Sequence, residues 1–124
     1  MSRGLLRLTL LALAFGLGTC GFGWWAVPLV AFAWGVMNGP ARRVAVRAGV
    51  AAAIAWALLL LAPGLTGAPA FSFAGKLAGA MQMPIWALWT VEIGFPLTVA
   101  WSAALFGSAF RGAPPARDSA PAAQ

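Results

Sequence analysis

The stretch LTLLALAFGLGTCGFGWWAVPLVAFAWGVM, residues 8 to 37, contains no charged side chain. An apolar run of 18 or more residues is typical of a helix that crosses a membrane. As one straight helix this stretch would reach about 45 Å. The hydrocarbon core of a bilayer is only about 30 Å thick. The stretch is therefore too long for one perpendicular span.

Four glycines gather in the middle of this stretch, at residues 16 to 23, and two tryptophans follow them. Glycine clusters permit tight reversals, and tryptophan favours the headgroup level of a bilayer. We therefore expect a helical hairpin, with one span over about residues 5 to 18 and a second over about 22 to 37. Pro28, near the start of the second span, removes one hydrogen bond at a tolerable position. A single long helix is the alternative.

The N-terminus also has features of a secretory signal peptide: two early arginines, an apolar region over residues 8 to 17 and the motif Ala12-Leu13-Ala14. Residues 17 to 20 (LGTC) faintly resemble a lipoprotein processing motif, although the residue before the cysteine is not Gly, Ala or Ser. The apolar character continues beyond Cys20, whereas a secreted domain should turn polar. We therefore expect a retained helix.

A third apolar run predicts a span over about residues 44 to 62, which ends before Pro63-Gly64. Residues 65 to 75 are expected to form a loop, because Gly and Pro recur there. Residues 74 to 83 are expected to form a short interfacial helix, with Lys76 and Gln82 toward water.

A fourth span is expected over about residues 84 to 110, with Pro84 in a good first position. It is long, and Gly94 together with Pro96 should kink or unwind it. The transmembrane domain then comprises residues 1 to 111, and residues 112 to 124 form a disordered, polar cytoplasmic tail.

The distribution of basic residues favours four spans over three. With four spans, both termini and the central loop share one side, which then holds seven arginines, while Lys76 alone is on the other. With three spans the division is five against three. Because cytoplasmic loops carry the excess of Lys and Arg, we expect both ends in the cytoplasm. The arginines are Arg3, Arg7, Arg42, Arg43, Arg47, Arg111 and Arg117.

The composition supports the membrane assignment. Of the 124 residues, 62% are hydrophobic and only 8% are charged, whereas soluble domains carry about 25% charged residues. The net charge of +6 does not indicate nucleic-acid binding, because the basic residues lie at the edges of apolar runs instead of forming a stripe with stacking aromatics. The predominance of Arg over Lys, with abundant Ala and Gly, suggests a GC-rich bacterium. We therefore expect an all-α, multi-pass transmembrane bundle in a bacterial inner membrane.

Small residues at four-residue spacing mark faces where helices in lipid approach closely. The third span carries the longest such series, and the second contributes Gly35. We expect Gly35, Gly49, Ala53 and Ala57 to form a packing face, either inside the bundle or toward a partner. Trp24, Trp25, Trp86 and Trp89 are expected to anchor the outer interface as an aromatic belt.

The residues available for catalysis exclude most enzyme chemistry. The chain has no His and no Tyr, and its only acids are Glu92 and Asp118. Imidazole ligation of a metal and a His-based triad are therefore excluded. We expect no catalytic, metal or cofactor site and no enzyme activity. Cys20 is the only cysteine, so no internal disulfide can form.

Glu92 is the residue that the membrane prediction does not explain. It lies eight residues, or about 12 Å along a helix, after Pro84. Ionisable side chains at such depth usually face a protein interior or a water cavity. A protonated Glu92 could bond a carbonyl freed by Pro96 or pair with Lys76 or with another subunit. A carboxylate beside unwound backbone could also line an ion pathway.

These observations predict a non-catalytic accessory, structural or assembly subunit of a larger membrane complex, of the respiratory or photosynthetic type. Its expected partners are membrane lipids and other integral membrane subunits or further copies of itself. The alternative is an oligomeric transporter or channel for a small solute or protons that uses Glu92. A weaker alternative is lipid or quinone binding between helices, against Trp56 or Trp101.

Overall fold

The computed structural model describes residues 3–40, 42–67 and 69–112, and every regular element in these ranges is helical. Three helical stretches, Arg3–Asn38, Arg42–Leu65 and Ile85–Arg111, are long and apolar enough to cross a membrane. The predicted all-α class is confirmed. The predicted tail beyond Gly112 lies outside the described residues. In chain order the elements are α1 (Arg3–Phe22), the 3₁₀ helix η1 (Gly23–Trp25), α2 (Ala26–Asn38), α3 (Arg42–Leu65), α4 (Ala70–Ala80) and α5 (Ile85–Gly112).

The first long stretch folds back on itself at Gly23. The φ angle of Gly23 is 71°, in the left-handed region that glycine adopts without steric cost. A Cβ atom on Gly18 would lie 3.0 Å from the Cβ of Ala26 and 3.9 Å from Val30. In a straight helix, residues 18 and 30 would be about 18 Å apart. The expected hairpin is therefore present, and the other three glycines of the cluster lie inside α1.

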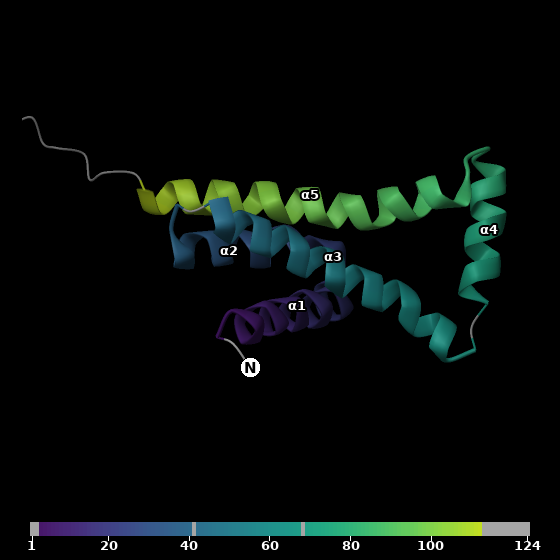
Figure 1. Cartoon of the computed structure of the whole chain (residues 1–124), viewed down its shortest axis with the longest axis horizontal. Coiled ribbons are helices and arrows are strands. Elements are labelled where there is room, and N and C mark those ends of the chain that lie inside the picture. The colour runs from purple at the N-terminus through teal and green to yellow at the C-terminus, as the bar shows by residue number, and fades with distance from the viewer. Residues whose placement is uncertain (1–2, 41, 68, 113–124) are drawn as a thin grey trace, which may run out of the picture.

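The helices alternate in direction along the long axis of the molecule. α1 and α3 run one way and α2 and α5 run the other, so the start of α1 and the end of α5 lie at the same end (Figure 1). α2 has 13 residues and α5 has 28, or about 20 Å and 42 Å. α3 and α5 therefore continue beyond the hairpin turn, to the end where α4 crosses the long axis (Figure 1).

Close backbone contacts join α5 to both α2 and α3. A Cβ atom on Gly35 of α2 would lie 2.2 Å from the carbonyl oxygen of Ala104, and one on Gly107 of α5 would lie 2.2 Å from that of Phe32. A Cβ atom on Gly49 of α3 would lie 3.1 Å from the carbonyl oxygen of Leu97. Such small residues let backbones approach, and van der Waals packing then holds the helices together.

The packing face of α3 follows alternating steps of three and four residues. The sequence predicts a face of residues spaced four apart. Each residue turns the helix by about 100°, so four residues overshoot one full turn by about 40°, and such a series winds away from a straight face. Gly49 therefore lies on the buried face, while Ala53 and Ala57 are half-buried beside it. The buried residues of this face are Ala45, Ala48, Gly49, Ala51, Ala52 and Ala55.

Two prolines lie inside long helices without ending them. α3 continues through Pro63 to Leu65, three residues beyond the predicted end, where the hydroxyl of Thr66 donates to the Pro63 carbonyl at 2.9 Å. α5 is continuous across Pro96, so the unwinding expected there is not found. Pro96 leaves the carbonyl of Glu92, four residues earlier, without its N–H donor, and the hydroxyl of Thr98 donates to the nearby Gly94 carbonyl at 3.0 Å.

α4 begins earlier than the sequence suggested, so the predicted loop over residues 65 to 75 is wrong in its second half. The carbonyl of Pro69 accepts the N–H of Phe73 at 2.9 Å and the hydroxyl of Ser72 at 2.8 Å. The first of these is the first backbone hydrogen bond of the helix, with Pro69 as its N-cap residue. α4 ends at a Schellman motif, in which Gln82 takes the left-handed position with φ 53°.

The contact between α2 and α5 can be tested by adding one methyl group. Gly35→Ala should lower the free energy of unfolding by about 2 kcal/mol, because the new Cβ atom can be accommodated only if the two backbones separate. Gly16→Ala is the matched control, since a Cβ atom there would have nothing within 4 Å. Unfolding in detergent, followed by tryptophan fluorescence, measures both. Equal effects of the two variants would contradict the contact.

Candidate functional site

Glu92 is the only acidic residue in the part of the chain that the structure describes, and it lies where α3, α4 and α5 meet. It lines a pocket of about 220 Å³. The remaining lining side chains are apolar, and they include Leu60 and Pro63 from α3, Phe73 and Leu77 from α4, and Leu88 and Trp89 from α5. One carboxyl group in an otherwise apolar pocket suits a cation or a hydrogen-bond donor.

A small second core holds α4 against the start of α5. Ala74, Ala78 and Leu88 are buried together, and Trp89 packs against them. The ring of Phe71 lies 5.9 Å from that of Trp89. This cluster is separate from the main core, and it fixes the position of the Glu92 pocket at the α4 end of the molecule.

Glu92 is half-buried and forms no hydrogen bond or ion pair with any described residue. The carbonyl that lacks an N–H partner at Pro96 is that of Glu92 itself, four residues earlier. The carboxyl group does not bond to it. Lys76 is exposed on α4, and the pairing with Glu92 considered from the sequence is not formed. The carboxyl group is therefore left to water or to another molecule.

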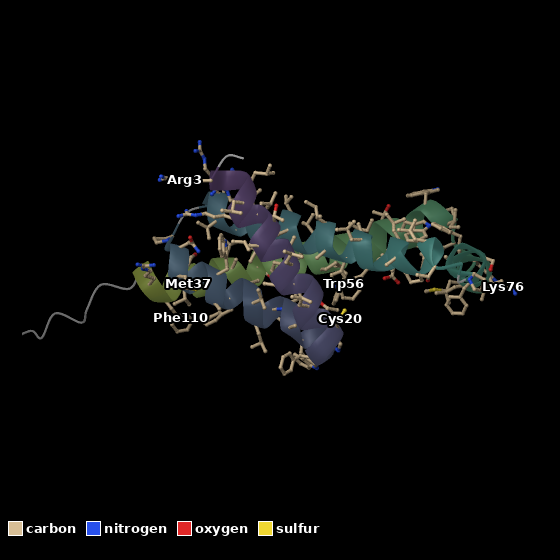
Figure 2. All side chains as sticks on the ribbon, turned by 90° about the horizontal axis from the view of Figure 1, so that it is seen from below. Arg3, Cys20, Met37, Trp56, Lys76 and Phe110 are labelled. Atoms are coloured by element: carbon tan, nitrogen blue, oxygen red, sulfur yellow. The ribbon has the colours of Figure 1, made fainter. Side chains whose placement is uncertain are left out.

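The basic residues separate along the long axis. Arg3 lies at the end that holds the start of α1, and Lys76 lies at the opposite end (Figure 2). Arg42, Arg43 and Arg47 occupy the first turns of α3. Arg111 is in the last turn of α5. Arg117 and Asp118 lie outside the described residues.

Arg111 joins the end of α5 to the end of α2. Its guanidinium donates to the carbonyl of Val36 at 3.3 Å and to that of Met37. These carbonyls belong to the last turn of α2, where backbone acceptors have no partner within the helix. A positive charge at a helix C-terminus is also favourable to the macrodipole. The sequence indicated only a charge near the membrane surface, because the pairing depends on how α2 and α5 align.

The tryptophans expected in one outer belt lie at two levels. The rings of Trp24 and Trp25 stack at 4.1 Å in the hairpin turn, which lies beside the middle of α3 and α5 (Figure 1). Trp86 is exposed and Trp89 half-buried in the first turns of α5, near α4. The two pairs differ in level because α2 is much shorter than α5.

The other aromatic and metal-ligating candidates do not form a second site. Trp56 packs against the main core, with its indole nitrogen buried and without a partner, whereas Trp101 is 40% exposed. Within the described ranges, no group of three or more His, Cys, Asp or Glu could hold a metal ion. Cys20 is exposed near the end of α1.

Comparison with known proteins adds no assignment. No protein-family model, curated protein or solved structure matches the chain.

The Arg111 contact with α2 is expected to stabilise the fold. Arg111→Gln should lower the free energy of unfolding by about 1 kcal/mol, because the last turn of α2 loses a charge-assisted cap. Arg7→Gln removes the same charge from the same end of the molecule, and should have little effect. Thermal unfolding in detergent compares the two variants. Equal losses would mean that overall charge, and not this cap, is responsible.

Proposed function

We propose that the protein is a four-span protein of a bacterial inner membrane, with both ends in the cytoplasm, which serves as an accessory or assembly subunit of a larger membrane complex. The alternating helix directions and the three long apolar stretches support four spans. The first stretch counts as two spans, because it reverses at Gly23. α4, which crosses the long axis, suits an interfacial helix on the opposite side of the bilayer.

Helix lengths agree with this placement. Arg111 and Glu92 are nineteen residues apart on α5, or about 28 Å. The hydrocarbon core of a bilayer is about 30 Å thick. With the arginine-rich end at the cytoplasmic surface, Glu92 lies near the level of the outer interface. On α3, the distance from Arg47 to Leu65 is about 27 Å. The length of α3 therefore also matches the thickness of the hydrocarbon core.

The observation that supports a partner most directly is the environment of Glu92. It is half-buried in an apolar pocket, without a polar partner in the described chain. The hairpin of α1 and α2 ends short of this level, so α3 and α5 have no α1 or α2 beside them near Glu92 (Figure 1). A helix of another subunit could fill that space and donate a hydrogen bond to the carboxyl group.

A conduit through one copy is less well supported. Between the Glu92 pocket and the arginine-rich end, α3 and α5 are joined by alanines that are 0–4% exposed, such as Ala48, Ala52, Ala100 and Ala104. Helices packed this closely leave no room for a solute or a chain of waters. A transport pathway would therefore have to run between copies of the chain.

The placement in the membrane can be tested with introduced cysteines. Cys20→Ser removes the only native thiol. In that background, Lys76→Cys should react with a membrane-impermeant maleimide from outside intact spheroplasts, whereas Arg43→Cys should react only after permeabilisation. The expectation follows from the excess of arginines at one end. Labelling of both positions from the same side would contradict the four-span arrangement.

The subunit role is tested by isolating the full chain from native membranes in mild detergent. We expect an integral membrane subunit to co-purify in a fixed ratio. Glu92→Leu should lose most of it, because the hydrogen-bonding group is removed, while Glu92→Gln should retain part of it. Thr90→Val is the control, since Thr90 is exposed on the same helix and its hydroxyl is bonded to the Trp86 carbonyl.

Two results would decide against this role. Isolation of a lone monomer would remove the subunit proposal. Proton or solute flux in reconstituted vesicles that Glu92→Gln abolishes would favour the transport alternative instead.

A further inference from the structure

The outward face of α3 changes character along its length. At its start, Arg42, Arg43 and Arg47 line a cleft of about 450 Å³ together with Val46. All three arginines are exposed, and none forms an ion pair or hydrogen bond with a described residue. Three positive charges so close together repel one another unless an anion neutralises them.

No acid of the described chain can supply that anion. Glu92 lies in the pocket at the far end of α3. Arginine presents a planar fork of N–H donors that fits the oxygens of a phosphate group in a bidentate manner. The cleft therefore suits a phosphate from another molecule.

An apolar track leads away from this cleft along the same helix. Val46, Val50, Ile54 and Leu58 follow one another at four-residue intervals, and each is at least 39% exposed. From Val46 to Leu58 the track covers about 18 Å. This is close to one leaflet, because the whole hydrocarbon core is about 30 Å thick.

The track ends in a groove between α1 and α3. The groove has a volume of about 530 Å³, and Ile54 and Leu58 line it together with Leu13 and Leu17 of α1. The hydroxyl of Thr9, the polar side chain in this lining, is bonded to the carbonyl of Leu5. The groove is therefore chemically suited to hydrocarbon chains.

We infer that the cleft of Arg42, Arg43 and Arg47, with the apolar track below it, is a binding site for one anionic glycerophospholipid of the cytoplasmic leaflet. The phosphate lies among the arginines, and an acyl chain follows the track into the groove. A lipid whose headgroup also carries a positive charge is disfavoured, because that charge meets three arginines. This inference rests on the proposed membrane placement.

The test uses the full chain in detergent, with endogenous lipid removed. Its thermal unfolding is followed while phosphatidylglycerol, or phosphatidylcholine with the same acyl chains, is added. Phosphatidylglycerol should raise the unfolding temperature and phosphatidylcholine should not. The comparison needs no variant, so it stands even if a variant folds poorly. Equal shifts with the two lipids would overturn the inference.

Two double variants with the same change in net charge locate the site. Arg43→Gln with Arg47→Gln should weaken phosphatidylglycerol binding about tenfold or more, because two of the three positive charges that attract the anionic headgroup are removed. Arg3→Gln with Arg7→Gln should leave the affinity within about twofold of the unmodified chain, since these residues lie on α1 outside the cleft. Equal losses in both would indicate general charge attraction and overturn the site.

Two further measurements distinguish binding of a lipid from binding of a free anion. Inorganic phosphate alone should give a much smaller shift, and Ile54→Ala with Leu58→Ala should weaken lipid binding. A full shift with inorganic phosphate, or no effect of shortening the track, would contradict the acyl contact. Carbonate extraction of native membranes checks the placement separately. Release of the unmodified chain by carbonate would contradict the membrane proposal. If the chain stays in the membrane but shows no preference for phosphatidylglycerol, only the lipid-site inference is contradicted.

Discussion

The fold depends on the backbone contacts that α5 makes with α2 and with α3. Where Gly35 meets Ala104 and Gly107 meets Phe32, a single added Cβ atom would lie 2.2 Å from a carbonyl oxygen. Lipid offers little hydrophobic drive for helix association, so close packing of such small residues has to hold the bundle together. α5 makes this contact with α2 and a looser one with α3 at Gly49. The other helices are arranged around it.

The unequal lengths of the helices follow from the turn at Gly23. Because the chain reverses there, α2 has only 13 residues to return to the arginine-rich end, where Asn38 and Gly39 close it. α3 and α5 have no such limit and extend to α4. α1, α2, α3 and α5 thus lie together at one end, and α3 and α5 continue to the other end, where α4 joins them (Figure 1). Glu92 lies toward this other end, which is why it has no partner among the described residues.

Much of this arrangement follows from sequence alone. The charge-free run of residues 8 to 37 is too long for one span, and its glycines predict the hairpin that is observed. The pairing of the helices cannot be predicted in this way. A single sequence shows which helix faces consist of small residues, but it does not show which of these faces pack against each other. The roles of Arg111 and of the Glu92 pocket depend on that pairing. α4 begins before its predicted start at residue 74, because the bonds to the Pro69 carbonyl in its first turn cannot be read from composition.

The contact of α2 with α5 also constrains how the protein is made. Residues 39 to 84 are synthesised between the end of α2 and the start of α5. Membrane chains are inserted from the N-terminus onward. During that interval Gly35 lacks the backbone of Ala104, and the last turn of α2 lacks its cap from Arg111. The hairpin therefore gains its closest packing contact and the cap on α2 only when the final helix is made.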